Sequence, residues 1–348
     1  MEFNALNGTS SCNSNLIFDL SDPVLADQWV ATDIERFFVH VFIPVVSAVG
    51  VFGNAAFMFM VFRLPELRTS LNAYLVNLAV CDIMFLLFVN FWYALYTSDV
   101  DLKLDVKSAL GCAFYMITTR VWYLGSVELM TIISVERFYA ICKPLQHIMM
   151  RGKRRTFKIL LAIWFVAVLV ALTVVPNNVV FKEACVLWPP MEIYEDLPTI
   201  KRLCYPVNIQ AEIYDNMMAL IDFVGPLIVN IWLYVCIILA LQSRPVISAS
   251  GVDERQKANA DRVRNQVART LILNGVVFFL CQTPYRFHNL HTLLTIMRGY
   301  GILGSRYHFI ISVGHIFLLM NSVINPFLYV FSCQFYRQSL MKALGFRR

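Results

Sequence analysis

Ionisable side chains stand inside long apolar runs of this sequence, and their types and spacing are what could do chemistry. An ionisable group within a membrane is costly and is usually functional. None of them falls into a catalytic pattern: there is no nucleophile elbow, phosphate-binding loop, His-Glu-x-x-His or pair of metal ligands. We therefore expect them to bind a ligand and transmit a signal, not to catalyse a reaction. They are Asp82, Arg120, Glu136, Arg137, Asp222 and Arg286.

The composition indicates that lipid as well as water surrounds the chain. Of its 348 residues, 58% are hydrophobic and 15% are charged, whereas soluble domains have roughly 45–50% and about 25%. Apolar runs of roughly 20 residues recur along the chain, long enough for membrane-spanning helices. They lie near 38–63, 71–96, 109–141, 156–176, 214–242, 262–294 and 307–331. We predict an all-α membrane protein, a seven-transmembrane helix bundle spanning residues 38–333.

A short surface helix is expected at the C-terminus, in residues 334–348. Phe335, Leu340 and Leu344 alternate there with basic residues, a pattern typical of an amphipathic helix lying on the bilayer. A frayed terminus is the alternative.

The charges of the links predict how the chain crosses the membrane. The link after the third span is basic and without acid, and the sixth span is also entered through basic residues, whereas residues 1–37 are acidic. The positive-inside rule then places 1–37 outside the cell and the tail in the cytoplasm, as expected of a multi-pass plasma-membrane protein. Asn7 begins a glycosylation sequon, which fits that side. No signal-peptide pattern precedes the first span, so that span is expected to direct its own insertion.

This topology places four of the nine cysteines outside, where disulfides form. They are Cys12, Cys112, Cys185 and Cys204, and four cysteines allow three pairings.

The polar residues of the spans follow a recognisable order, starting with Gly53-Asn54, Leu78 to Asp82 and Glu136-Arg137-Phe138. Pro226 and Tyr234, then Phe278 and Pro284, follow in the fifth and sixth spans, and Asn321 to Tyr329 closes the seventh. In this order and at these spacings, the chain resembles the rhodopsin-like (class A) G-protein-coupled receptors. Pro284-Tyr285-Arg286 and Asn321 to Pro326 are similar to the thyrotropin-releasing-hormone, ghrelin and neuromedin receptor group of the peptide branch. A transporter or channel is the alternative from another class.

The resemblance implies roles for particular residues. Glu136 and Arg137 would form a charge pair at rest, released when Arg137 meets a heterotrimeric G protein. Cys112 would bond Cys204, leaving Cys12 and Cys185 as a second bridge. The residues implied in G-protein coupling are Glu136, Arg137, Tyr234, Arg264 and Tyr329; those implied in switching are Phe278, Gln282, Pro284, Asn325 and Pro326.

No cofactor is expected, apart from a possible allosteric sodium ion. Its oxygen ligands would come from Asp82, Ser126, Asn321, Ser322 and Asn325. A hydrated polar network without an ion is the alternative.

The sequence departs from the family pattern at three positions. Phe138 replaces the commoner Tyr, and Arg264 stands where many relatives have an acid, so Arg137 has no ion-pair partner there. Gln282 replaces the usual Trp, whose role then falls to Phe278 or Tyr285.

The expected ligand is an extracellular peptide. Residues 307–331 lack the lysine that an opsin needs, and Thr119 replaces the aspartate of amine receptors. The long loop from Asn177 to Glu212 suits a β-hairpin lid, and the lining below it is polar and aromatic. The predicted ligand-binding residues are Thr119, Arg120, Tyr123, Met218, Asp222, Tyr285, Arg286, Asn289 and His315.

Two alternatives remain open for this pocket. Arg120 and Arg286 could meet a ligand carboxylate or an amidated carboxy terminus, or Asp222 or Glu128 could neutralise them internally; if Asp222 pairs with Arg286, only Arg120 is free. A small anionic or lipid ligand is the alternative to a peptide. Membrane lipids are expected partners and nucleic acids are not.

Overall fold

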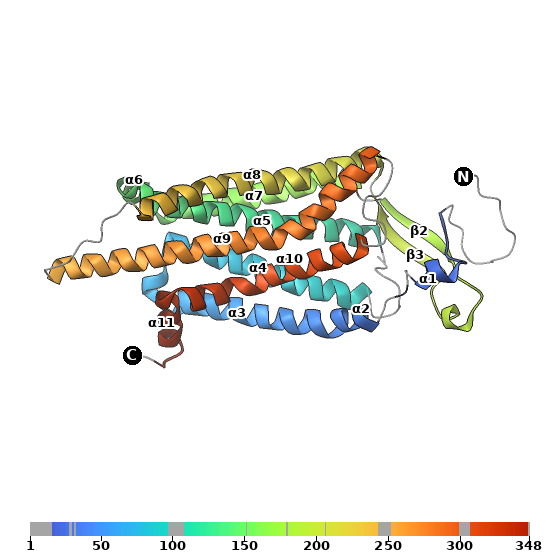
Figure 1. The fold of residues 1–348 in the computed structure, drawn as a ribbon, viewed down its shortest axis with the longest axis horizontal. Coiled ribbons are helices and arrows are strands. Elements are labelled where there is room, and N and C mark those ends of the chain that lie inside the picture. Colours follow the sequence, from blue (N-terminus) through green and yellow to red (C-terminus); the bar gives the residue numbers. More distant parts are fainter. Residues whose placement is uncertain are drawn as a thin grey trace.

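The computed structural model describes residues 16–27, 30, 33–96, 108–150, 152–178, 180–205, 207–242, 252–298 and 307–346. Long helices lie side by side, with a small sheet at one end and α11 at the other (Figure 1). We call these the sheet end and the α11 end.

Seven long helices form the bundle, as predicted. Within the described residues, six helices are long and apolar enough to cross a membrane. The remaining long helix, α5, carries Arg120, Glu128, Glu136 and Arg137. The bundle consists of α3 (Ile43–Arg63), α4 (Ser70–Tyr96), α5 (Ala109–Cys142), α7 (Lys153–Asn178), α8 (Ile209–Gln242), α9 (Val252–Arg298) and α10 (Tyr307–Ser332).

The position of α5 explains how it carries these charges. It packs against α4, α7, α8 and α9, while α10 closes the bundle by packing on both α9 and α3. Lipid therefore meets little of α5, whose charged side chains can find partners on neighbouring helices. The Ser108 hydroxyl caps the helix by accepting a hydrogen bond from the Gly111 amide at 3.1 Å.

Short helices connect or flank the bundle. They are α1 (Pro23–Asp27), α2 (Asp33–Phe37), the π-helical turn η1 (Phe38–Phe42), η2 (Pro65–Leu67), α6 (Pro144–Met150), η3 (Glu192–Tyr194) and α11 (Gln334–Ala343). The helix α11 occupies the place of the predicted surface helix. It is fixed by a hydrogen bond from the buried Tyr336 hydroxyl to Asn72 Oδ1 (2.9 Å) and by an exposed ion pair from Lys342 to Glu66 (2.7 Å).

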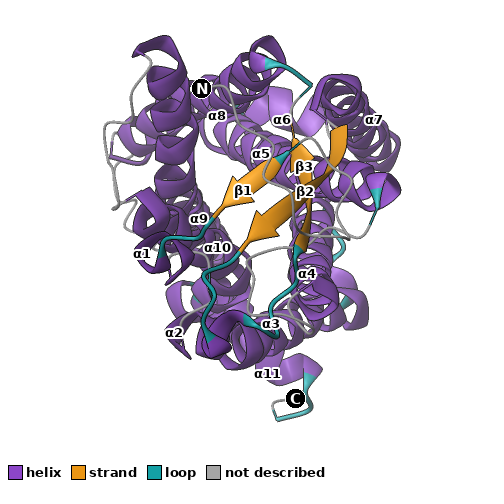
Figure 2. Cartoon of the chain, turned by 90° about the vertical axis from the view of Figure 1, so that its right-hand side faces the viewer, coloured by secondary structure: helices purple, strands orange, loops and turns teal. Residues whose placement is uncertain are grey.

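The predicted hairpin is present at the sheet end. Strands β2 (Val180–Leu187) and β3 (Ile200–Tyr205) pair antiparallel, with Phe181 opposite Cys204. A third strand, β1 (Ile17–Asp19), pairs parallel with β2 and was not predicted. Figure 2 views this end and shows the sheet lying across the ring of helices.

Candidate functional site

Arg120 forms the strongest charge cluster inside the bundle. Its Nη2 lies 2.8 Å from Asp222 Oδ2 and its Nη1 lies 3.1 Å from Asp215 Oδ1, so α5 and α8 are joined. The Arg120 side chain is only 11% exposed, and desolvated charges need such pairing to be tolerated. Of the alternatives left open by the sequence, internal neutralisation holds for Arg120. Asp222 pairs with Arg120, so the alternative in which it pairs with Arg286 and leaves Arg120 free is not the one found.

Arg286 has a different environment, although it is only 7% exposed. Its guanidinium carbon lies 4.0 Å from the centre of the Tyr123 ring and 5.3 Å from that of Tyr285. Nη1 donates a long hydrogen bond to Asn289 Oδ1 at 3.4 Å. No acid forms an ion pair with Arg286 in the described part of the chain. Aromatic faces attract this cation, but they do not neutralise it.

The other predicted ligand-binding residues divide into two groups. Asn289 donates to Asn216 Oδ1 at 3.0 Å, and the exposed His315 lies against the Tyr285 ring, with ring centres 5.3 Å apart. These residues therefore adjoin Arg286. In contrast, the Thr119 hydroxyl donates to the carbonyl of Tyr115 (2.8 Å), and Met218 is half-buried on α8 without a described polar contact.

A disulfide ties the hairpin to the bundle. Cys112, at the start of α5, is bonded to Cys204 of β3. Phe181 of β2 packs beside this bridge together with Phe88. Cys185 is also disulfide-bonded, while Cys12 and Asn7 lie outside the described residues. The hairpin is thus held against the end of α5, above Arg120 and Tyr123.

Buried polar groups form a chain through the middle of the bundle. Asn325 donates to Asp82 Oδ2 at 2.7 Å, and the Ser322 hydroxyl also bonds to Asp82. Ser126 bonds to Cys81, the neighbour of Asp82. Asn321 Oδ1 is buried without a hydrogen-bond partner among the described residues. All five residues of the predicted sodium site are buried, and a carboxylate with neutral oxygens, one of them unpartnered, is compatible in chemistry with a cation.

At the α11 end, Glu136 attracts Arg137 only through space and forms its ion pairs with other residues. Glu136 lies 3.4 Å from His147 of α6 and 3.6 Å from Arg155 of α7. Arg137 forms no ion pair within the described ranges, and its Nε is buried without a partner. The other predicted coupling cation, Arg264, pairs with Asp261 on its own helix at 2.9 Å. Arg264 and Arg137 repel, so neither can neutralise the other.

Tyr234 and Tyr329 are held by different partners. The Ser134 hydroxyl donates to the Tyr234 oxygen at 3.0 Å, while the amide of Asn274 donates to the Tyr329 oxygen at 3.3 Å. The Tyr234 phenol lies against Gly275 of α9, filling the space that any larger side chain there would need.

The predicted switch residues lie along α9 and α10. Phe278 is fully buried against Phe279, and Gln282 is buried with its Oε1 unpartnered among the described groups. Pro284 and Pro326 stand inside α9 and α10, where a proline removes a backbone hydrogen bond and allows a bend. A Cβ on Gly314 of α10 would lie 3.2 Å from the Tyr285 Cα, so the two helices are close at Pro284.

The chain matches a known protein family over the part that contains these residues. The model of the "7 transmembrane receptor (rhodopsin family)" matches residues 53–329, which includes the polar chain and both tyrosines. The chain belongs to this family of receptors.

The similar proteins are receptors, and the similarity extends over most of each chain. Neuromedin-U receptor 1 of Rattus norvegicus is 28% identical over 373 residues, covering 98% of this chain and 84% of the relative. Somatostatin receptor type 5 of Bos taurus is 26% identical over 315 residues (89% and 77%). G-protein coupled receptor 183 of Homo sapiens is 26% identical over 315 residues (86% and 78%). The receptor is therefore not an enzyme, as predicted.

Several residues of this receptor's site were missed in the sequence. Asp215 stands two helical turns before Asp222, so both fall on one face of α8, and this spacing could have revealed the second partner of Arg120. Arg155 counted only as one of the basic residues that indicate the topology, and His147 was not considered. Asn216 and Asn274 carried no signal that separates them from other asparagines of the spans.

Proposed function

We propose that this receptor is activated by an extracellular peptide, which enters the bundle beneath the β2–β3 hairpin, and that it then activates a heterotrimeric G protein. The names of the neuromedin-U and somatostatin receptors support a peptide. The disulfide to Cys112 ties β3 of the hairpin to α5, while β1 pairs along the other strand, β2. An extended ligand would pass beneath this sheet, in contact with its strands.

Arg286 is the observation that carries the proposal. Asp215 and Asp222 attract Arg286 only through space, without an ion pair among the described residues. A buried guanidinium whose N–H groups lack a charged acceptor is expensive, and a ligand that supplies this acceptor gains that energy on binding. A peptide carboxylate, or the carbonyl oxygens of an amidated carboxy terminus, would accept its N–H groups. Tyr123, Tyr285 and Asn289 would hold the guanidinium in place.

A small anionic or lipid ligand is the second candidate, because one guanidinium can also receive a lone anion. The lining around Arg286 is polar and includes Asn216, Asn289 and His315. It favours a peptide, because a lipid chain has no polar groups to match it.

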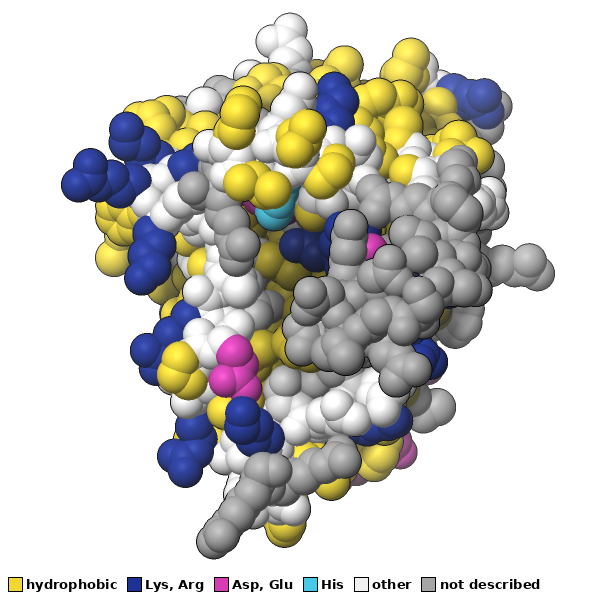
Figure 3. All heavy atoms as spheres, turned by 90° about the vertical axis from the view of Figure 1, so that its left-hand side faces the viewer, with side chains coloured by type: hydrophobic (Ala, Val, Ile, Leu, Met, Phe, Trp, Pro, Cys, Tyr) yellow, Lys and Arg dark blue, Asp and Glu magenta, His cyan; other side chains and the backbone are white. Residues whose placement is uncertain are grey.

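We infer the orientation of the receptor in the membrane from the charges at the two ends of the bundle. We place the sheet end outside, with residues 1–37, and the α11 end in the cytoplasm. Figure 3 shows the α11 end, where Lys and Arg side chains far outnumber acidic ones, as the positive-inside rule requires. On this face Arg137, with no ion pair among the described residues, is the group that would meet the G protein.

A sodium ion is proposed at Asp82. Ser126, Asn321, Ser322 and Asn325 would complete its ligands with neutral oxygens. Sodium would stabilise the resting arrangement of α4, α5 and α10, so raising sodium should lower basal activity in the receptor but not in Asp82→Asn.

A reconstituted exchange assay tests the proposal. The purified receptor in nanodiscs is mixed with purified G proteins, and nucleotide exchange is followed while peptide pools are added. We expect one pool to speed exchange with the wild type and none to do so with Arg137→Ala. The variant should still bind the active peptide, since Arg137 lies at the opposite end from the pocket. A wild-type receptor that responds only to lipids would contradict the peptide proposal.

A further inference from the structure

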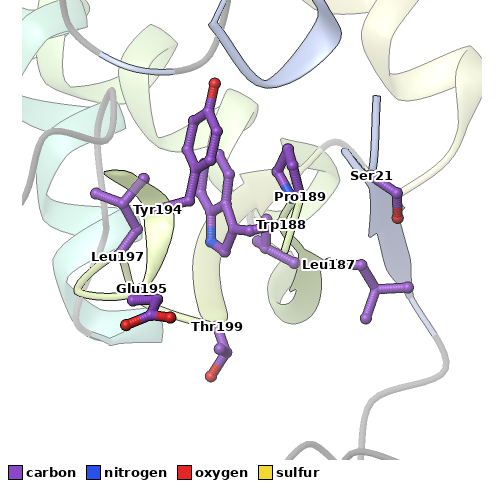
Figure 4. Close-up of a pocket in the computed structure, with 9 residues that line it drawn as sticks. Ser21, Leu187, Trp188, Pro189, Tyr194, Glu195, Leu197 and Thr199 are labelled. Carbon is purple, nitrogen blue, oxygen red and sulfur yellow. The ribbon is translucent and has the colours of Figure 1, made fainter. Parts of the chain in front are cut away.

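A cavity lies outside the helix bundle, between the hairpin and the segment that follows β1. Its volume is about 360 Å³, and it is lined by Ser21, Val186, Leu187, Trp188, Pro189, Tyr194, Glu195, Leu197 and Thr199. Figure 4 shows Ser21 and Leu187 at the right and Leu197 and Glu195 at the left, with the rings of Trp188 and Tyr194 overlapping between them. Ligand sites usually have about 300–1,000 Å³, so this cavity suits one or two side chains. We call it the outer groove.

The groove is built by a small folded unit, not by a loose loop. Parallel pairing of β1 with β2 brings Leu20 and Ala26 onto Val186 and Tyr194, and all four are buried together. The segment before α2 is thereby fixed to the hairpin, so its groups face the cavity in a defined arrangement.

Two aromatic rings form one wall. Trp188 and Tyr194 stack with their centres 5.8 Å apart and an interplanar angle of 7°. The indole N–H donates to the carbonyl of Pro198 at 3.0 Å, and the Tyr194 hydroxyl donates to Asp27 Oδ1 at 2.6 Å. The hydrogen bond to Asp27 also raises the pKa of Tyr194. Both rings are therefore oriented before any ligand arrives, which lowers the entropy cost of binding.

The charge around this wall has a single sign. Residues 16–30 and 186–199 contain no Lys, Arg or His, while their acids are Asp19, Asp22, Asp27, Glu192, Glu195 and Asp196. Glu195 lines the groove, is exposed, and forms no ion pair among the described residues. Hydrogen bonds from the Ser21 hydroxyl and amide hold the pKa of Asp19 below its usual range, so Asp19 stays ionised.

Aromatic faces beside unpaired carboxylates attract a cation that carries an apolar stem. We propose that the outer groove is a second subsite for the peptide ligand, which takes a Lys or Arg side chain, with its apolar neighbour, from a basic segment of the peptide. The inference rests on the proposed peptide-receptor function. The ligand then has two ends of opposite character: a basic segment at the outer groove and an acceptor group at Arg286.

A fluorine NMR titration tests the groove without any activity readout. The full-length receptor is labelled with 5-fluorotryptophan, placed in zwitterionic nanodiscs, and the Trp188 signal is assigned with Trp188→Phe. Three tripeptides are added in turn: acetyl-Arg-Phe-Arg-amide, acetyl-Gln-Phe-Gln-amide and acetyl-Glu-Phe-Glu-amide. We expect the basic tripeptide to shift the Trp188 signal saturably, the neutral one more weakly, and the acidic one not at all.

Two neighbouring acids provide the matched variants. Glu195→Gln should raise the dissociation constant of the basic tripeptide by about two- to five-fold, the range of an exposed ion pair. Asp196→Asn removes the same charge one residue outside the lining and should have a smaller effect. A Trp188 signal that no tripeptide moves, or that all three move equally, would overturn the inference.

The outcomes separate this inference from the proposed function. If the receptor responds to a peptide in the exchange assay but the basic tripeptide leaves Trp188 unmoved, only the outer groove is wrong. If no peptide activates the receptor, the proposed function fails, and the subsite role fails with it even where the tripeptide binds.

Discussion

Two arginines lie in the same part of the bundle and have opposite roles because their neighbours differ. Arg120 joins Asp215 and Asp222, so α5 and α8 share a neutralised cluster. Arg286 rests on Tyr123 and Tyr285 with only an amide as a hydrogen-bond partner among the described residues. The first arginine links the two helices, and we propose that the second binds the ligand.

Arg286→Gln should weaken the potency of the activating peptide by about 10- to 150-fold. This factor corresponds to the roughly 1.5–3 kcal/mol that a hydrogen bond to a charged group contributes. The potency at Arg286→Lys should lie between those of the wild type and Arg286→Gln, because lysine keeps the charge but loses the planar stacking. Concentration–response curves at matched surface expression measure the effect. Arg298→Gln, at the exposed end of the same helix, is the control. Wild-type potency in Arg286→Gln would show that this arginine is structural.

A second residue-scale prediction concerns Gly275. A Cβ at this position would collide with the Tyr234 phenol, so Gly275→Ala must displace the ring from Ser134. We expect a loss of about 1–3 kcal/mol in stability, as for overpacked cores, seen as a lower melting temperature in thermal unfolding.

The matched variants for Gly275 are a rescue and a control. Tyr234→Phe removes the oxygen nearest to the new methyl group, so it should recover part of the loss in the double variant. Gly225→Ala has no atom within 4 Å of its Cβ and should change little. Additive losses in the double variant would mean that the two residues do not compete for space.

The contacts of a single residue could be predicted from the sequence only where a sequence motif indicates its neighbours. Asp82 and Asn325 were assigned in advance to one group of polar residues, and the structure has these two hydrogen-bonded. The partner of Glu136 was not predictable, because three cations, Arg137, His147 and Arg155, lie within reach in sequence and only helix packing selects among them.

At the scale of elements, apolar runs and charges located the helices well. The hairpin was also expected, because its two strands are close in sequence and a long loop separates two helices. Strand β1 was not expected: three residues carry too short an alternation to be recognised, and their partner Cys185 is far away in the chain. Long-range pairing of short strands depends on tertiary contacts that a single sequence does not display.

Removing the bridge between Cys112 and Cys204 should loosen the hairpin. Its sequence separation is 92 residues, for which chain entropy predicts about 4–5 kcal/mol; the membrane already restricts the unfolded chain, so the measured loss should be smaller. We expect Cys112→Ser with Cys204→Ser to lower the melting temperature and to weaken peptide binding. Cys236→Ser, at a free cysteine of α8, is the control. Unchanged peptide binding in the double variant would show that the hairpin does not shape the pocket.

At the scale of the whole molecule, the two ends differ in charge as well as in structure. The sheet end carries the acidic segments of the outer groove, and the α11 end carries the basic links. In the proposed orientation, ligand and G protein would be separated by the length of the bundle. The polar chain around Asp82 and the prolines of α9 and α10 lie between them, where helix bending can couple the two ends.

This arrangement predicts which end faces the medium, and two exposed residues allow a direct measurement. Ile193 lies in η3 at the sheet end and is 75% exposed; Leu145 lies in α6 at the other end and is 78% exposed. Since both are equally open to solvent, a cysteine at either position should react equally fast with a maleimide that reaches it. In intact cells, a membrane-impermeant maleimide should label Ile193→Cys and leave Leu145→Cys unlabelled until the membrane is permeabilised. The free cysteines within the described residues are buried or half-buried, so the unsubstituted receptor gives the background. Labelling of Leu145→Cys alone in intact cells would show that the receptor has the opposite orientation in the membrane. The proposed peptide site would then face the cytoplasm and the proposed G-protein site the outside.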